Sequence, residues 1–222
     1  MKLSKETLGL LKNFSGINSN LVLRDTGKLT TISAQKNIMA SANVTEAFPA
    51  EFGIYDLNEF LGAMSLFTDP DLMFSEKFVT VKEGGNSIKY YAADKSVLAY
   101  PQKEISFPSS DVDFTLTSAT LAMISRTASV LRAPDLSIIG ADGKITLTVG
   151  DRKNATANTY DIEVGSADTS FDVAMKVENL KMIPADYAVS ISSKKISRFK
   201  NGDTVYYAVS YTHLTLPTNR EV

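Results

Sequence analysis

Only a few residues of this sequence have types and spacings that could carry out chemistry. Asp69-Pro70-Asp71 sets two carboxylates close together, as general acid–base catalysis or a metal ion would require. The proline between them favours a loop instead. Gly84-Gly85 could let the backbone approach a phosphate, but such a cradle needs a helix directly after it, and the sequence indicates none. A hairpin turn is the better interpretation of the glycine pair.

The composition of the chain excludes most other kinds of catalytic and metal site. The chain has no cysteine, which excludes disulfides, thiolate zinc sites and cysteine nucleophiles. Its single histidine, His213, lies in residues 210–222, which resemble the translation of a sequencing adapter. We expect this stretch to be a non-native tail, with a genuine frayed end as the alternative. The common nucleotide-binding and hydrolase motifs are absent. The expectation is therefore no enzyme, with no catalytic residue, no metal site and no cofactor.

The elements that must position any functional side chain are predicted from periodicity. Ser4 and Asp56 are favourable N-caps, and Glu59 would complete a capping box with Asp56. Pro184 should end the last helix. Each helical segment has an apolar stripe on one face. The four predicted helices are 4–14, 56–66, 118–132 and 175–183.

Between the helices the sequence shows the alternation of short β-strands. Residues that tolerate positive φ separate them, such as Asp142-Gly143 and Asn201-Gly202. Asp94 to Pro108 contains two prolines and no helical period, so we expect an extended connector there. The clearest predicted strands are 21–24, 78–82, 144–149, 159–164 and 187–191.

One local pattern occurs twice in the chain. Phe52-x-Ile54 followed by Glu59-x-Leu61 returns as Phe171-x-Val173 followed by Glu178-x-Leu180, with the same spacing inside each copy. A fixed offset of about half the chain indicates a duplicated domain, and 222 residues suffice for two modest cores. The prediction is an α+β fold of two similar domains, 1–107 and 108–209, each with antiparallel sheets and two helices.

Charge placement is more informative than net charge. The chain carries a formal net charge of −2, yet the predicted helices hold six bases against four acids. Bases therefore lean toward the helices, as expected if helices face a polyanion; ordinary solvated helix faces are the alternative. No apolar run approaches the length of a membrane span, and the start of the chain lacks the layout of a secretory signal, which favours a cytoplasmic setting.

Several runs of residues are specific enough to compare with a known family. They are Met1-Lys2-Leu3-Ser4-Lys5-Glu6-Thr7, Leu10-Leu11-Lys12-Asn13-Phe14, Ile17-Asn18-Ser19, Ile54-Tyr55-Asp56-Leu57-Asn58 with Phe60-Leu61-Gly62, and Leu180-Lys181-Met182 with Pro184 and Tyr187. These runs resemble the DNA polymerase sliding clamps of T-even-type tailed bacteriophages, which are DNA polymerase processivity factors. The similarity extends from Met1 to about Val209 and is loosest over residues 133–167.

The resemblance implies a homotrimeric ring with helices around a central hole and sheets outside. Such a clamp would encircle duplex DNA without reading its sequence and would tether the replicative DNA polymerase. An ATP-dependent clamp loader would open the ring, since this chain has no nucleotide motif of its own. The setting implied is the cytoplasm of an infected bacterial host, with no membrane partner.

The resemblance also suggests roles for three sets of residues. The expected DNA-facing bases are Lys5, Lys12, Arg126, Lys176 and Lys181. The expected subunit-interface residues, on two edge strands, are Ser87, Ile88, Tyr90, Tyr91, Tyr160, Ile162 and Val164. The expected partner-peptide pocket comprises Ile105, Phe107, Val189 and Tyr207. The alternatives are solvated bases, edge strands blunted within the monomer, and plain core residues.

Two other classes of protein remain open from the residues alone. One is a trimeric structural (virion) phage protein without DNA affinity, which would share the sheet-rich, cysteine-free character. The other is a small-molecule enzyme whose site uses residues set aside above. Salt-dependent retention on circular DNA that is lost when the circle is cut would separate a clamp from both.

Overall fold

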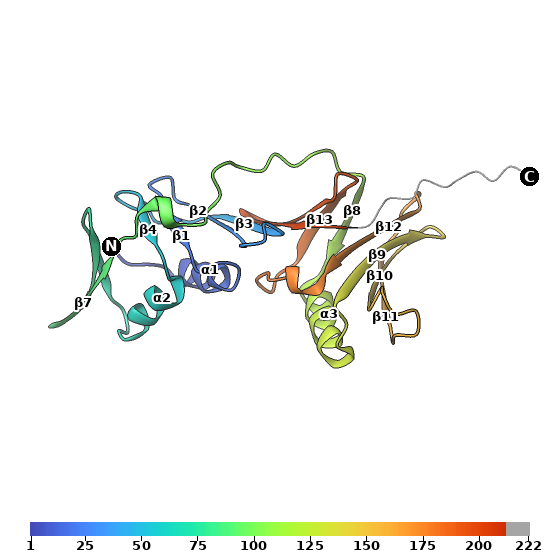
Figure 1. Ribbon diagram of the computed structural model, residues 1–222, viewed down its shortest axis with the longest axis horizontal. Helices are drawn as coiled ribbons and strands as arrows, with labels where there is room; N and C mark the ends of the chain where they lie inside the picture. Colours follow the sequence, from blue (N-terminus) through green and yellow to red (C-terminus); the bar gives the residue numbers. More distant parts are fainter. Residues whose placement is uncertain (212–222) are drawn as a thin grey trace, which may run out of the picture. The chain divides into compact units, whose positions relative to one another are not determined.

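The computed structural model describes residues 1–211 and forms two compact units, divided between Glu104 and Ile105 (Figure 1). This division falls inside the predicted connector, whose only regular element is a short 3-10 turn, η1 (Lys95–Val97). Most of the expected tail, including His213, lies outside the described residues. Ser210 and Tyr211 of that tail are described: their backbone N–H groups donate to Lys195 O and Ala174 O, both at 3.0 Å.

Helix α1 (Lys5–Ser15) begins at the cap that the sequence predicts. Ser4 Oγ accepts a hydrogen bond from Thr7 N at 3.1 Å. Glu46 adds to this start by accepting from Ser4 N and from Thr7 Oγ1, both at 2.6 Å. The apolar stripe of the helix is buried, including Phe14. The opposite face of α1 is therefore left to the solvent.

Helix α2 (Leu57–Ser65) also has its predicted cap. The Asp56 carboxylate accepts from Asn58 N at 2.9 Å and from Glu59 N at 3.2 Å. The helix buries its side chains at helical spacing. Both predicted helices of the first half are thus confirmed.

Short antiparallel strands complete the first unit. They are β1 (Leu21–Leu23), β2 (Lys28–Ile32), β3 (Ile38–Asn43), β4 (Phe52–Ile54), β5 (Asp71–Phe74), β6 (Phe78–Glu83) and β7 (Asn86–Tyr91). Strand β1 pairs with β4, β2 pairs with β3, and β5, β6 and β7 form one sheet in that order. The turn between β6 and β7 uses Gly84 at φ +57°, as the hairpin interpretation of the glycine pair predicts.

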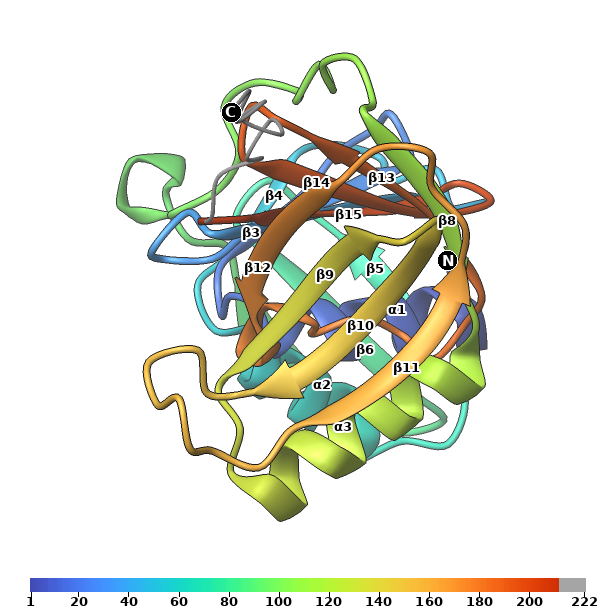
Figure 2. The ribbon, with the colours of Figure 1, turned by 90° about the vertical axis from the view of Figure 1, so that its right-hand side faces the viewer.

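Within its described residues, 105–211, the second unit has one α-helix and two four-stranded antiparallel groups. Its elements are β8 (Val112–Leu116), α3 (Ser118–Leu131), β9 (Asp135–Ala141), β10 (Lys144–Gly150), β11 (Tyr160–Gly165), β12 (Phe171–Lys176), the 3-10 turn η2 (Val177–Asn179), β13 (Tyr187–Ser192), β14 (Ile196–Asn201) and β15 (Thr204–Val209). The strand orders are β11-β10-β9-β12 and β15-β14-β13-β8. Figure 2 shows the first of these sheets with α3 beside it. The α+β class and the five predicted strands are confirmed.

The fourth predicted helix, 175–183, is wrong. Residues up to Lys176 continue strand β12, which pairs with β9, and only the turn η2 follows. The apolar residues that mimic a helical stripe serve two elements: Met175 is buried in the sheet, whereas Leu180 is buried in the loop after η2. The second copy of the repeated pattern therefore keeps its strand but not its helix, because sheet pairing overrides a short helical period.

Glu46 provides a test of how α1 is held. We expect Glu46→Gln to lower the free energy of unfolding by about 1 kcal/mol at neutral pH. Partial burial raises the pKa of Glu46, but hydrogen bonds from Thr7 and Ser4 outweigh burial and hold the pKa below its usual value. The stabilisation is therefore complete above the unfolded-state pKa and is lost as the pH falls through the folded-state pKa.

Urea unfolding at pH 7 and at about pH 3 measures this effect. Glu76→Gln, an exposed change in the same unit, should leave stability unchanged at both values. A Glu46→Gln deficit of equal size at low pH would contradict the carboxylate's role.

Candidate nucleic-acid interface

Two of the expected DNA-facing bases lie on the exposed face of α1. Lys5, Gly9 and Lys12 follow one another at i, i+4 and i+7, so they line one side of the helix. The position that a Cβ of Gly9 would take has no atom within 4 Å. Within residues 1–211, neither lysine forms an ion pair with a carboxylate. Helix α1 thus presents two ammonium groups without an ion-pair partner, and no side chain rises between them at Gly9.

Arg126 holds a similar position on α3. It is exposed, and its neighbours Ala122, Ser125 and Ser129 are exposed and small. Ser125 Oγ donates back to Leu121 O at 3.1 Å, so it does not project from the helix as a free donor. Arg126 is consequently the longest polar side chain on that face, and it forms no ion pair in the described part of the chain.

Helix α2 does not share the positive charge of α1 and α3. It contributes no base and carries an exposed acid, Glu59. With the fourth predicted helix absent, α1, α2 and α3 together hold three bases against two acids. The positive character of the helices therefore rests on Lys5, Lys12 and Arg126 alone.

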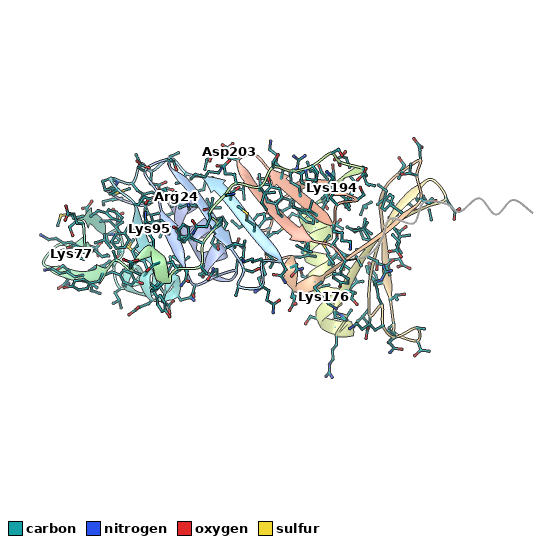
Figure 3. The ribbon with its side chains drawn as sticks, turned by 45° about the horizontal axis from the view of Figure 1, so that its top comes forward. Arg24, Lys77, Lys95, Lys176, Lys194 and Asp203 are labelled. Atoms are coloured by element: carbon teal, nitrogen blue, oxygen red, sulfur yellow. The ribbon has the colours of Figure 1, made fainter. Side chains whose placement is uncertain are left out.

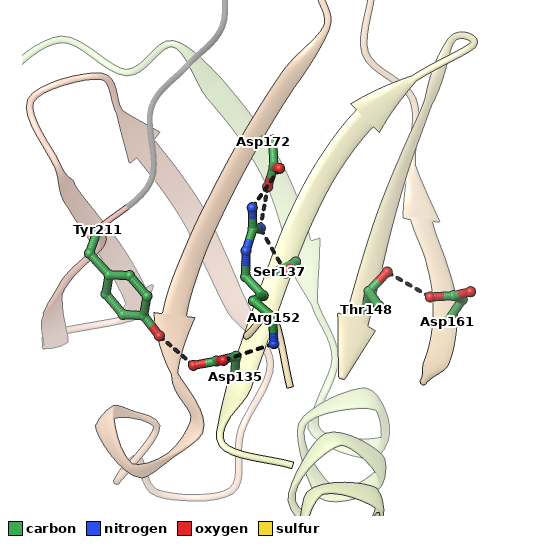
Figure 4. A network of polar contacts seen from close by, with 7 residues as sticks. All are labelled: Asp135, Ser137, Thr148, Arg152, Asp161, Asp172 and Tyr211. Carbon is green, nitrogen blue, oxygen red and sulfur yellow. Dashed lines mark hydrogen bonds and ion pairs between the residues drawn. The ribbon is translucent and has the colours of Figure 1, made fainter. Parts of the chain in front are cut away.

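Lys176 lies at the end of β12 and not on a helix, and it points at a buried acid. Lys176 Nζ is 2.6 Å from Asp135 Oδ1, and the Asp135 side chain is only 3% exposed. Arg152 N at 3.1 Å and Tyr211 Oη at 2.6 Å also donate to this carboxylate (Figure 4). Burial raises the pKa of Asp135, but the bonds from Lys176, Tyr211 and Arg152 hold the pKa below its usual value. The charge of Lys176 is thus largely neutralised by Asp135 within the unit.

The same network fixes the loop that follows β10. Arg152 donates to both Asp172 oxygens at 2.5 and 2.8 Å, and to Ser137 Oγ at 3.0 Å (Figure 4). A bidentate arginine–carboxylate pair is geometrically specific. It ties this loop to both β9 and β12, which keeps Asp135 and its partners in place.

Lys181 is exposed in the loop between η2 and β13, and hydrogen bonds replace the missing helix there. Tyr187 Oη donates to Ile183 O at 2.5 Å, and Tyr206 Oη accepts from Ile183 N at 3.3 Å. Burial raises the pKa of Tyr206 to about 12, so the phenol stays neutral at physiological pH. Asp186 Oδ1 accepts from Ser118 N at 2.7 Å. The loop that carries Lys181 is therefore joined to the N-terminus of α3.

A surface hollow of about 480 Å³ lies beside α3. Ser125 and Ser129 line it from the helix, and Lys176 and Glu178 line it from the other side. The two charged residues have opposite signs, and Lys176 already pairs with Asp135. These side chains give the hollow no net charge for a phosphate.

The expected interface residues lie on two edge strands. Within the described residues, β7 pairs only with β6 and β11 pairs only with β10. Tyr90 is partly fixed inside its unit, since its Oη donates to Asp56 O at 3.0 Å. Tyr91 and Tyr160 are exposed. Pairing of these edges between copies stays a prediction.

The expected pocket residues divide between two faces of one sheet. Phe107 stacks on Tyr207 with ring centroids 6.3 Å apart, and the Arg198 guanidinium carbon lies 4.5 Å from the Phe107 centroid. Ile105 is half-buried nearby in sequence. Val189 is 1% exposed and pairs with Phe199, one residue out of phase with the Arg198–Tyr207 row. Val189 therefore faces the core and cannot share a pocket with Phe107.

Sequence reasoning missed four charged residues at these places. Lys89 on β7, Asp161 and Glu163 on β11, and Arg198 on β14 are absent from the predicted sets. Side chains alternate along a strand, so a choice of apolar positions skips the charged ones on the other face. That alternation was the available signal for the first three. Arg198 carried no local signal, because its contact with Phe107 joins residues far apart in sequence.

Basic residues also occur away from the helices. Figure 3 labels Arg24, Lys77, Lys95 and Lys194 among them. Arg24 and Lys95 both lie within ion-pair distance of Glu51, whereas Lys77 and Lys194 form no ion pair in the described residues. Lys77 and Lys194 therefore serve as comparison sites for the helix bases.

Comparison with family models gives two matches that follow the two units. A model described as DNA polymerase processivity factor matches residues 4–100. A model described as gp45 sliding clamp, C terminal, matches residues 113–212.

Individual relatives agree with these matches over nearly the whole chain. The sliding clamp of Vibrio phage KVP40 is 33% identical over 215 residues, covering 93% of this chain and 97% of the relative. The sliding clamp of Enterobacteria phage T4 is 30% identical over 201 residues, covering 87% of this chain and 88% of the relative. That of Escherichia phage RB69 is 28% identical over 216 residues, covering 93% and 95%.

Solved structures show the same fold at low sequence identity. Proliferating cellular nuclear antigen from Entamoeba histolytica has a TM-score of 0.67 at 17% identity, covering 93% of this chain and 95% of that one. The pol III beta chain of Caulobacter crescentus has a TM-score of 0.70 at 15% identity, covering 96% and 66%. No helix among residues 1–211 is long and apolar enough to span a membrane.

Lys176 can be tested for the internal role that its contacts indicate. We expect Lys176→Gln to lower the free energy of unfolding by about 1–3 kcal/mol, because it leaves the buried Asp135 carboxylate without its cationic partner. Lys200→Gln, an exposed change in the same unit, should cost less than about 0.5 kcal/mol. Equilibrium urea unfolding at neutral pH measures both. Equal stability of Lys176→Gln and the unmodified chain would contradict the assignment.

Proposed function

The chain belongs to the family of phage sliding clamps that serve as DNA polymerase processivity factors, and on that premise we propose that three copies close into a ring around duplex DNA. As a member of this family it is an accessory protein of DNA replication and not an enzyme. DNA and a DNA polymerase are the partners that the family implies. A homotrimer, an ATP-dependent loader and the cytoplasm of an infected bacterium are the finer parts of the proposal.

One observation carries the proposal: the family matches cover both units, and relatives of known type align over nearly their full length. The two units therefore belong to one clamp chain. The unpaired bases of α1 and α3 support a DNA-facing role for the helices. A virion protein without DNA affinity would have no need of such a face.

The proposed mechanism depends on topology more than on contact strength. Lys5, Lys12, Arg126 and Lys181 screen phosphate charge without reading bases, so the ring can move along any sequence. Each contact is weak and sensitive to salt. A closed ring keeps the polymerase near its template because the tether holds its local concentration high. Lys176 contributes less to this surface, since Asp135 already neutralises it.

The partner-peptide site is proposed at the connector. Ile105, Phe107 and Tyr207 supply half-exposed apolar surface, and Arg198 lies against Phe107. Arg198 Nη2 donates to Ser190 Oγ at 3.0 Å, and its Nε has no acceptor in residues 1–211. An arginine without an acidic partner beside aromatic rings fits an apolar peptide that carries a carboxylate.

Removal of the helix bases tests the DNA-facing role. A triple variant with Lys5, Lys12 and Arg126 changed to Gln should bind duplex DNA more weakly. The magnitude of the slope of log K against log salt should fall by up to about 2.7, at about 0.9 for each lost phosphate contact. A matched triple variant with Lys77, Lys82 and Lys194 changed to Gln removes the same charge from strands and turns, and its slope should not change.

The readout uses linear duplex whose ends are blocked after incubation with the protein. Threaded rings should stay on blocked DNA and leave when the ends are opened, both for the unmodified chain and for the triple variants. An equal loss of slope in the two triple variants would contradict a helix-lined hole. Release that does not depend on the ends would contradict encirclement.

The oligomeric state can be measured independently of DNA binding. Sedimentation equilibrium at micromolar concentration should give three times the 24.1 kDa chain mass. A stable monomer or dimer under these conditions would remove the ring of three from the proposal.

A further inference from the structure

We propose that an ion pair between copies, from Lys89 on β7 to Glu163 and Asp161 on β11, fixes how one copy joins the next. This inference rests on the ring assembly proposed above, and it adds the polarity of the joint and limits its register to two. The occupant of each edge strand is a second copy of the same chain.

Strands β7 and β11 are uncovered at one edge, whereas the opposite edges of their sheets are partly covered. At the β5 edge, Met1 and Leu72 exchange two backbone hydrogen bonds at 2.7 and 2.8 Å. At the β12 edge, Tyr211 N donates to Ala174 O. Unpaired edge groups favour the addition of another strand. Within the described residues, β7 and β11 are therefore suitable edges for a joint in their respective sheets.

The two strands have the same division of side chains between their faces. On β7, Ile88 and Tyr90 lie opposite the buried Val81 and Val79, so they face the core. On β11, Ile162 lies opposite the buried Leu147 and also faces the core. The charged residues Lys89, Asp161 and Glu163 alternate with these and face the solvent. Both edges are apolar on the core side and charged on the outer side.

Matching core side to core side restricts the register. The pairs within both units are antiparallel, and side chains alternate with period two. If Ile88 pairs with Val164 and Tyr90 with Ile162, then Lys89 lies directly opposite Glu163. A slip of two residues puts Lys89 opposite Asp161 instead. A slip of one residue would turn Lys89 toward the core. That register is excluded, because burying an unpaired charge is too costly.

The surrounding charges favour this partner. Lys144 Nζ is 2.8 Å from Glu163, and Thr148 Oγ1 donates to Asp161 at 2.6 Å, so the β11 side holds two acids and one base. Lys89 Nζ lies 4.8 Å from the Phe78 ring centroid and has no ion pair within residues 1–211. The β11 side therefore carries one more acid than base, which leaves a net negative charge opposite Lys89.

Charge also excludes the symmetric joints. Two β7 strands would bring two Lys89 residues together, and two β11 strands would bring four acids together. Like charges on facing strands are destabilising. Only β7 against β11 joins opposite signs, and a head-to-tail joint of this kind generates a ring when its rotation closes.

A charge swap tests the inference. Lys89→Glu and Glu163→Lys should each raise the concentration for half-assembly about tenfold or more, since every joint then opposes like charges. The double variant with both changes should return to near the unmodified value. Sedimentation velocity over a dilution series measures all four proteins.

Two controls separate the joint from the fold. Lys36→Glu makes the same change in the turn between β2 and β3, on another sheet of the same unit, and should assemble normally. Lys144→Gln removes the pair within the copy but leaves Glu163, and should also assemble normally. Far-UV circular dichroism should show every variant folded.

A mixture adds a sharper outcome. Lys89→Glu and Glu163→Lys chains can alternate, but a ring of three always leaves one joint between like charges. Equal mixtures should therefore close less well than the double variant. Normal assembly of both single variants would overturn the ion pair while leaving the ring intact, whereas failure of the unmodified chain to form a trimer would overturn the proposed ring itself.

Discussion

A strand at the edge of a sheet exposes backbone N–H and C=O groups on one side, and these groups need partners. In this chain β7 and β11 are edge strands of their sheets, so their outer backbone groups have no strand partner within the described residues. The turn at Gly84 and the pairing of β10 with β9 hold the two strands as edges. The core side chains Tyr90 and Ile162 set which face each edge turns outward. The proposed ring follows from this constraint, since a second copy supplies the missing strand.

Burial decides which positive charges are available to a polyanion. Lys12 and Arg126 project from helix faces and form no ion pair in the described residues, whereas Lys176 lies against the buried Asp135. The two kinds of base look alike in a sequence, because both fall on the polar side of an apolar period. Their roles differ: one kind stabilises a sheet, and the other sets the electrostatic potential of a surface.

The parts of the fold that depend on local chemistry were predictable. Caps at Ser4 and Asp56 follow from side-chain hydrogen bonding to nearby N–H groups, and the alternation at β11 follows from the strand period. Segment 175–183 was not predictable in this way, because its pairing partner β9 lies far away in sequence. The candidate site likewise had predictable and unpredictable parts. The helix bases could be found by position, but the core-facing orientation of Val189 and the contact of Arg198 with Phe107 required the sheet register.

The loop between η2 and β13 has a consequence for variation in this protein. One residue inserted into an α-helix rotates everything after it by about 100°. In the loop, Tyr187 and Tyr206 anchor the backbone at Ile183, downstream of Lys181. An insertion here would not turn β13 in this way, because Tyr187 and Tyr206 hold Ile183, but it would displace Leu180 and Met182, which are both buried. Substitution of the exposed Lys181 is therefore the change that this loop tolerates, so its charge can vary while its length cannot.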